Sequence, residues 1–110
     1  MNSEDLKQRT KRMSLAVFAL TAKVRSSRES DVIIRQLIRS ATSVAANYRA
    51  ACKARSRSDF INKIGIVEEE ADETSLWVEY LIDLKFVGEQ DARLSGRKTM
   101  NLWQFLLRQQ

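Results

Sequence analysis

Apolar residues recur at alternating steps of three and four along most of the chain, which is the spacing of one buried face of an α-helix. The pattern predicts four helices, over residues of about 3–24, 31–54, 57–85 and 91–107. The third is the most regular, and its apolar stripe runs through Phe60, Ile64, Val67, Ala71, Thr74, Val78, Leu81 and Lys85. The fourth is the weakest, because Gly96 interrupts it and its apolar residues form no clear stripe.

Small polar residues mark the positions where these helices are expected to begin. Ser3 and Ser30 are the expected N-caps of the first two helices. Ser56, with Asp59 three residues further on, resembles a capping box. Gly88 is the expected stop of the third helix, since glycine readily takes the left-handed conformation that ends a helix.

The second predicted helix carries its apolar stripe beside a row of smaller residues. The expected core stripe is Ile34, Leu37, Ile38, Ala41, Ala45, Tyr48 and Cys52. The row along its edge consists of Ser40, Val44, Asn47 and Ala51. Small side chains allow a neighbouring helix to approach closely, so this edge is an expected helix contact.

Composition excludes several classes of protein. The 110 residues include 3 Gly, no Pro and no His, which excludes His-based catalytic triads, His-ligated metals and glycine-rich phosphate loops. So few turn-forming residues also argue against an all-β fold. Cys52 is the only cysteine, the apolar runs are too short to span a bilayer, and the N-terminal residues do not resemble a signal peptide. We therefore expect one cytoplasmic domain over residues 1–110, with an all-α fold.

Charge divides the chain into two parts of opposite sign. Residues 1–58 hold 13 basic and 4 acidic residues, whereas residues 59–92 hold 2 basic and 10 acidic residues. Helices of opposite charge favour one another as neighbours, although each exposed ion pair contributes only about 0–1 kcal/mol. The expected architecture is an antiparallel up-and-down four-helix bundle.

Two helices carry apolar residues on a second face, which a monomeric bundle does not need. On the first helix these are Leu15, Phe18 and Ala22, opposite the main stripe. On the third helix, a second seam at heptad-like spacing is formed by Ile66, Glu70, Glu73, Trp77, Tyr80 and Leu84. The simplest explanation is self-association through these faces, and the alternative is a wide stripe that reaches around a crowded core.

The second predicted helix also carries a row of cations. Its members are Arg35, Arg39, Arg49 and Lys53, and the row continues into the following turn with Arg55 and Arg57. Cations on a rigid helix can follow a phosphate backbone. No aromatic residues lie between them to stack on bases, so binding would depend on shape and phosphate rather than on base sequence. The alternative is a solvated face, or ion pairs with Glu70, Glu73 or Glu79.

Other polar residues have simpler interpretations. Glu70 and Glu73, three residues apart on one helix face, could hold Mg²⁺ as in helical nucleotide pyrophosphatases, but the second acidic motif of those enzymes is missing. No metal or cofactor is therefore expected. Cys52 lies on the core stripe and is expected to act as a small apolar residue. Asn47 is expected to set the helix register through a hydrogen bond to Glu70 or Glu73.

Residues 36–51, QLIRSATSVAANYRAA, resemble the signature of a known family, the 23S rRNA intervening-sequence proteins, also called four-helix-bundle proteins. The resemblance continues through 54–64 and 68–74 to the Trp77-Val78-Glu79 motif, and covers roughly residues 5–85. Ala45 stands where the family often has glycine, and the segment from Gly88 onward departs from the usual acidic, Leu-rich fourth helix.

The resemblance implies a four-helix bundle that assembles into a ring, typically a homopentamer. Some members are encoded inside insertions in ribosomal RNA genes, and RNA binding has been suggested for them on that basis. No enzymatic activity is associated with the family. The related accessory proteins of diversity-generating retroelements are basic pentameric bundles that engage nucleic acid and a reverse transcriptase.

Residues and resemblance together predict a non-enzymatic, oligomeric helical bundle that binds RNA through its basic row, with no membrane or small-molecule partner. One alternative is a scaffolding oligomer, similar to the retroelement accessory proteins, whose cations serve only subunit contacts. The other is a Mg²⁺-dependent nucleotide hydrolase that uses Glu70 and Glu73.

Overall fold

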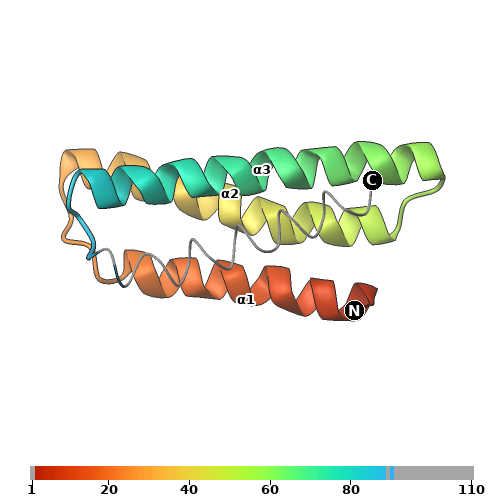
Figure 1. The fold of residues 1–110 in the computed structure, drawn as a ribbon, viewed down its shortest axis with the longest axis horizontal. Helices are drawn as coiled ribbons and strands as arrows, with labels where there is room; N and C mark the ends of the chain where they lie inside the picture. The colour runs from red at the N-terminus through yellow and green to blue at the C-terminus, as the bar shows by residue number, and fades with distance from the viewer. Residues whose placement is uncertain (1, 89, 91–110) are drawn as a thin grey trace.

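The computed structural model describes residues 2–88 and 90, which form three α-helices and no β-strand. Helix α1 spans Ser3–Thr21, α2 spans Arg28–Cys52 and α3 spans Arg57–Asp83. Consecutive helices run in opposite directions and are joined by short turns (Figure 1). The all-α prediction is confirmed, and the fourth helix predicted over 91–107 lies outside the described residues.

The caps of α1 and α2 lie outside the predicted residues. Asn2, not Ser3, caps α1, because its side chain accepts a hydrogen bond of 2.9 Å from the Asp5 N–H while the Asp5 carboxylate accepts one of 3.2 Å from the Asn2 N–H. Ser27, not Ser30, caps α2, and Ser30 is the third helical residue of the same kind of reciprocal box. Each helix therefore begins where two side chains satisfy two backbone N–H groups together.

The start of α3 is as predicted, but its end is not. Ser56 caps the helix by accepting a hydrogen bond of 3.0 Å from the Asp59 N–H. The helix then ends at Asp83, five residues before Gly88, and Lys85 takes a left-handed conformation with φ of 61°. The N–H of Phe86 bonds to the Leu81 carbonyl at 2.9 Å, which closes a Schellman motif. A lysine thus fills the position that a glycine usually takes.

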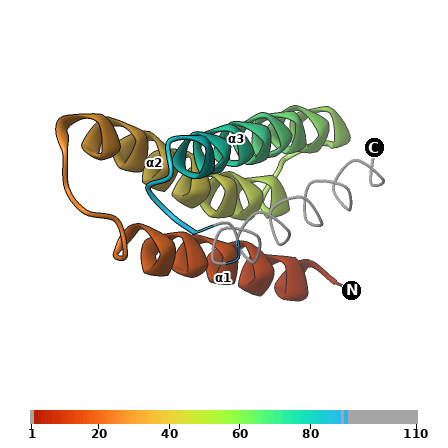
Figure 2. The same ribbon diagram turned by 60° about the vertical axis from the view of Figure 1, so that its left-hand side comes forward.

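Helix α2 lies between the other two helices and packs against both of them (Figure 2). Its buried face is rotated relative to the predicted stripe. The fully buried members include Ile33, Ser40, Val44 and Ala51, whereas Ile34, Ile38, Ala45 and Cys52 are half-buried. The rotation arises because α3 packs on the edge of small residues, which permits the closest approach. The stripe predicted for α3 is buried, except for Phe60, which is half-buried, and Lys85, which is exposed.

Buried hydroxyl groups join the middles of the three helices. The Ser14 hydroxyl on α1 donates a hydrogen bond of 2.9 Å to the Ala41 carbonyl on α2. One residue away, Ser40 on α2 accepts a hydrogen bond of 2.9 Å from the Thr74 hydroxyl on α3. These two bonds place Ser14, Ala41 and Thr74 at about the same level along the bundle. None of the helices in the described part of the chain is long and apolar enough to cross a membrane.

Candidate nucleic-acid interface

Cations occupy the side of α2 that faces away from the core. Arg35, Arg49 and Lys53 are all exposed. Because an α-helix turns by about 100° per residue, Arg35 and Lys53 lie on the same side, about 27 Å apart along the axis, and Arg49 lies about 40° away. No ion pair joins these three side chains to any residue that the structure describes. Within the described part of the chain, they form a row of unpaired positive charge.

The row continues around the turn between α2 and α3, where Arg55 and Arg57 are exposed. The turn itself is held by Asp59, whose carboxylate accepts hydrogen bonds from the Arg55 backbone N–H at 3.3 Å and from the Lys63 amine at 2.8 Å. The hydrogen bond from Lys63 is the main reason that the pKa of Asp59 lies below its usual value. Because Asp59 pairs with Lys63, both arginine side chains of the turn stay available to a ligand.

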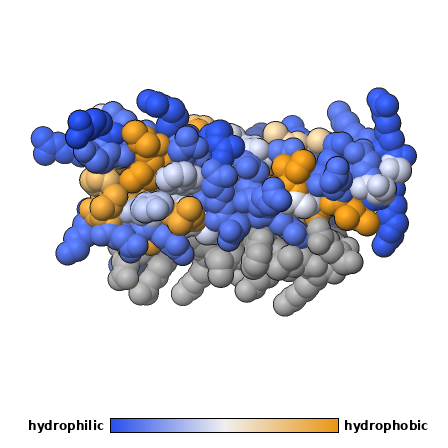
Figure 3. Space-filling model, turned by 90° about the horizontal axis from the view of Figure 1, so that it is seen from above, coloured by the Kyte–Doolittle hydropathy of each residue, from blue (hydrophilic) through white to orange (hydrophobic). Residues whose placement is uncertain are grey.

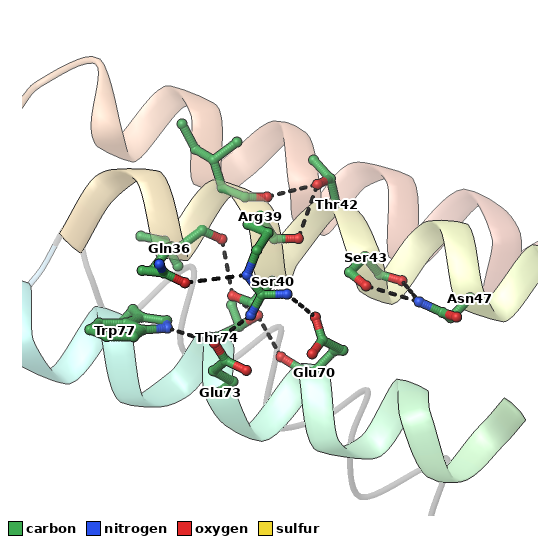
Figure 4. Close-up of polar contacts among 12 residues, drawn as sticks. Gln36, Arg39, Ser40, Thr42, Ser43, Asn47, Glu70, Glu73, Thr74 and Trp77 are labelled. Atoms are coloured by element: carbon green, nitrogen blue, oxygen red, sulfur yellow. Dashed lines mark hydrogen bonds and ion pairs between the residues drawn. The ribbon is translucent and has the colours of Figure 1, made fainter. Parts of the chain in front are cut away.

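Arg39 differs from the other cations of the row, because it bridges α2 to α3. Its guanidinium bonds to the Glu70 carboxylate at 3.0 Å and also to the Glu73 carboxylate (Figure 4). The Glu73 hydrogen bond is the largest cause of the raised pKa of Arg39, and the same bond lowers the pKa of Glu73. The two carboxylates together outweigh the single cation. Arg39 is itself exposed, but it is held in a structural ion pair, whereas Arg35, Arg49 and Lys53 are not paired with any described residue.

The prediction for Asn47 was half right. It is half-buried and makes hydrogen bonds, but both go to Ser43 of the same helix, to its carbonyl and to its hydroxyl, at 2.9 Å each (Figure 4). They do not reach Glu70 or Glu73. Arg39 takes these carboxylates instead, because its longer side chain spans the gap between the helices. The polar contacts between α2 and α3 are thus ion pairs at the surface, made by Arg39, and a hydrogen bond between the Thr74 and Ser40 hydroxyl groups in the core.

The residues assigned to self-association divide into two separate surfaces. On α1, Leu15, Phe18 and Ala22 are exposed, with 55% and 45% of the first two accessible. On α3, Ile66 and Leu84 are exposed, while Glu70, Glu73 and Trp77 are half-buried. Viewed onto the α2–α3 side, apolar patches lie toward both ends of the molecule, with polar residues between them (Figure 3). The structure describes the positions of these residues, and their role in assembly stays a prediction.

Trp77 is fixed by the same ion-pair cluster. Its indole N–H donates a hydrogen bond of 3.2 Å to Glu73, and its ring lies 5.5 Å from that of Tyr80. Trp77, Tyr80 and Leu84 line a groove of about 450 Å³ between α3 and the beginning of α2. On the α2 side the groove is lined by Arg28, Glu29, Val32 and Ile33. Sequence reasoning missed Val32, since a single apolar residue off the stripe carries no periodic signal.

Glu70 and Glu73 are unsuited to a metal ion in this arrangement, because Arg39 already occupies them. Among the residues that the structure describes, no group of three or more His, Cys, Asp or Glu side chains could hold a metal ion. Cys52 is half-buried. It contacts Tyr48, whose pKa is raised by burial and further by the hydrogen bond with Cys52. This region of the chain has the character of a packed core.

Known proteins resemble this chain in both sequence and fold. The family model described as 23S rRNA-intervening sequence protein matches residues 3–106. A crystal structure of a protein with unknown function from the S23 ribosomal protein family, from Bacteroides thetaiotaomicron, is similar to the chain with a TM-score of 0.89 and 29% sequence identity. The similarity covers 98% of this chain and 96% of that one. No curated protein matches the chain.

Proposed function

Since the chain belongs to the family of 23S rRNA-intervening sequence proteins, we propose that it is a non-enzymatic bundle protein that binds structured RNA. The family assignment confirms the resemblance carried by residues 36–51. The observation that carries the proposed activity is the row of exposed cations formed by Arg35, Arg49 and Lys53, with Arg55 and Arg57 in the turn. Completion of a four-helix bundle by 91–107, assembly into a ring-shaped homopentamer and a cytoplasmic location belong to the same proposal.

The spacing of the cations favours a phosphate backbone as the ligand. A span of about 27 Å along one side of a rigid helix can contact several phosphates without entering a groove. Arg39 is not assigned to this surface, because Glu70 and Glu73 already neutralise it. About five phosphate contacts per subunit would give a slope of log affinity against log salt near −4. Affinity would then fall on the order of 10²- to 10³-fold between about 50 and 200 mM salt.

A salt series with matched variants tests this proposal. The probe is a structured RNA hairpin, and the test protein carries Arg35→Gln, Arg49→Gln and Lys53→Gln together. We expect weaker binding and a slope that is smaller by about 3, one for each lost phosphate contact. Lys63→Gln is the control, because Asp59 already holds that amine at 2.8 Å, and its slope should equal that of the unmodified protein. An unchanged slope in the triple variant, or no RNA binding at about 50 mM salt, would exclude this surface.

The scaffolding alternative is favoured by the exposed apolar residues on α1 and α3. Under that alternative the protein assembles but does not bind RNA even at low salt, and a DNA duplex of equal length is not bound either. The nucleotide hydrolase that would use Glu70 and Glu73 has the least support, because Arg39 holds both carboxylates.

A further inference from the structure

The charges of α2 and its two flanking turns lie toward the ends of the helix. Residues 22–38, which cover the turn before α2 and its first part, hold four basic and two acidic residues. Residues 49–63, at the other end, hold five basic residues and one acidic residue. The nine residues 40–48, SATSVAANY, carry no charge. The cations of α2 therefore form two patches, one at each end, with an uncharged middle between them.

The acidic residues of the first patch are already engaged. The Glu29 carboxylate pairs with Arg28 at 3.2 Å, and both side chains are exposed. The Asp31 carboxylate accepts hydrogen bonds of 2.9 and 3.0 Å from the Ser26 hydroxyl. Within the part of the chain that the structure describes, no carboxylate pairs with Arg35. This end of α2 therefore presents Arg35 as an unpaired cation.

A phosphate placed beside the middle of α2 would meet negative charge. Arg39 holds both Glu70 and Glu73, so two carboxylates and one guanidinium leave a net charge of −1 (Figure 4). Glu70 lies one helical turn before Thr74, which bonds to Ser40, and the two helices run in opposite directions. Glu70 is therefore beside the uncharged stretch. A polyanionic ligand that fits this surface has its phosphates at the two ends and none in the middle.

The middle of the outer side also lacks long side chains. Thr42 follows Arg35 by seven residues and Ala46 precedes Lys53 by seven, so all four lie on nearly the same side of the helix. Ala46 is exposed, and Thr42 is half-buried with its hydroxyl bonded to a carbonyl of its own helix at 2.8 Å. Arg35 and Arg49, the cations that border this stretch, are about 21 Å apart along the axis. The outer side of α2 is thus low in the middle and has a long cation at each end.

Two rows of phosphate with an uncharged surface between them are the two edges of a duplex groove. The minor groove of A-form RNA is wide and shallow and displays 2′-hydroxyl groups between its phosphates. Short side chains such as Thr42 and Ala46 allow a helix to lie close to such a floor. The grooves of B-form DNA are about 7.5–8.5 Å deep, so these side chains would not reach their floors. A single strand presents one unbroken row of phosphates, which would pass beside Glu70.

We propose that α2 crosses the minor groove of double-stranded RNA, with Arg35 on one phosphate backbone and Arg49 and Lys53 on the other. Arg55 and Arg57 extend the second contact. Residues 40–48 then lie over the 2′-hydroxyl groups and read no base sequence. The inference rests on the proposed function, because it names the form of RNA that the same cations bind.

Ala46→Lys distinguishes a crossed groove from a continuous track of cations. On a track, the added lysine gains a phosphate contact, and the slope of log affinity against log salt becomes steeper by about 1. In a crossed groove, the long side chain holds α2 away from the floor and one end loses its contacts. We therefore expect a slope for an RNA duplex that is shallower by about 1 to 2, with weaker binding.

Two further variants separate length from charge. Ala46→Gln adds length without charge, and it should weaken binding of the RNA duplex as Ala46→Lys does. Gln8→Lys adds the same charge at an exposed residue of α1, and its slope should equal that of the unmodified protein. Both residues are exposed, so circular dichroism melting should show unchanged stability within about 0.5 kcal/mol.

Three nucleic acids of equal length supply the second measurement. They are an RNA duplex, one of its strands in a sequence that does not fold, and a DNA duplex. We expect a slope near −4 for the RNA duplex and near −2 for the single strand, because a single strand reaches the cations of only one end at a time. The DNA duplex should bind more weakly than the RNA duplex at every salt concentration.

The outcomes separate this inference from the proposed function. If none of the three nucleic acids binds at about 50 mM salt, the proposed function is wrong and the inference falls with it. If all three bind with the same slope, or if Ala46→Lys steepens the slope, the cations bind nucleic acid without crossing a groove. The proposed function then stands and the inference is wrong. A preference for the RNA duplex that Ala46→Lys and Ala46→Gln both reduce supports the crossed groove.

Discussion

The Thr74 hydroxyl on α3 donates a hydrogen bond of 2.9 Å to the Ser40 hydroxyl on α2, and neither side chain is accessible to solvent. Ser40 in turn bonds to the Leu37 carbonyl of its own helix at 3.1 Å. Thr74→Val keeps the shape of the side chain and removes the donor, so we expect the free energy of unfolding to fall by about 1 kcal/mol. Ser40→Ala should have an effect of similar size.

The double variant of this pair should be less destabilised than the sum of the two single variants. Replacing both partners leaves no hydroxyl without its partner, which is often nearly neutral. Urea denaturation of the four proteins gives the interaction energy as a double-mutant cycle. Strict additivity would show that the hydrogen bond between the helices contributes nothing to stability.

Arg39 makes part of the stability dependent on pH. Its hydrogen bond lowers the pKa of Glu73 below the value of about 4.3 that glutamate has in an unfolded chain. The contribution is therefore fully present above that value and is lost as the pH falls through the lowered pKa of the folded state. Arg39→Gln should reduce stability by about 1 kcal/mol at neutral pH and less at acidic pH. Denaturation at a series of pH values measures this, and a loss that is constant with pH would contradict it.

Glu68 has a pH dependence of opposite sign. One oxygen of its carboxylate is buried without a hydrogen-bond partner, and burial raises its pKa. A raised pKa means that the folded protein gains stability as the pH falls. Glu68→Met removes the unpaired oxygen and keeps the length of the side chain, so we expect a gain of about 1 kcal/mol near neutral pH. The gain should shrink as the pH falls through the raised pKa of Glu68, because the parent protein then takes up a proton there and no longer buries a charge.

Lys85→Gly should raise the melting temperature. Lys85 has φ of 61°, a conformation that is strained for residues with a Cβ atom and easy for glycine. The expected gain is about 1 kcal/mol, with no change in the helical content measured by circular dichroism. A decrease in stability would show that the lysine side chain makes a contact worth more than the backbone strain.

Gly65→Ala is the converse substitution and should also stabilise the protein. Gly65 lies inside α3, and a Cβ atom added there would meet no atom within 4 Å apart from its chain neighbours and the backbone of its own helix. Alanine is more favourable than glycine within a helix by about 0.8–1.0 kcal/mol. Thermal unfolding of the variant gives the size of the gain, and a destabilised variant would indicate that a neighbouring group occupies this space in the assembled protein.

Periodicity predicted the helices and their order because burial repeats along a helix, but it could not place every boundary. As residue types, Ser27 and Ser30 are equally good N-caps. Ser27 is the cap because its hydroxyl accepts a hydrogen bond from the Ser30 N–H, while the Ser30 hydroxyl accepts one from the Ser27 N–H. The end of α3 at Asp83 has no signal in a single sequence, since the left-handed backbone of Lys85 beyond it is stabilised by the hydrogen bond from the Phe86 N–H to the Leu81 carbonyl. The exact helix boundaries therefore depend on local hydrogen bonds that a periodic pattern does not report.

The sequence predicted which cations of the candidate site are exposed, but it did not predict which side chains pair with one another. The exposed positions of Arg35, Arg49 and Lys53 follow from helical spacing alone. Arg39 pairs with Glu70 and Glu73, and Asn47 does not. The difference arises from the distance between α2 and α3, which cannot be read from the sequence. The same limit applies to Trp77, whose orientation depends on Glu73.

The central position of α2 has a consequence for how the protein opens. Among the three described helices, α2 contacts both of the others, and its contact with α3 is the more extensive one. We therefore expect α1 to detach while the α2–α3 hairpin stays together. Native-state hydrogen exchange should then show two cooperative units, with the amides of α1 exchanging through a smaller opening energy than those at the centre of α2. The face that carries Leu15 and Phe18 would thus belong to the unit that opens most readily.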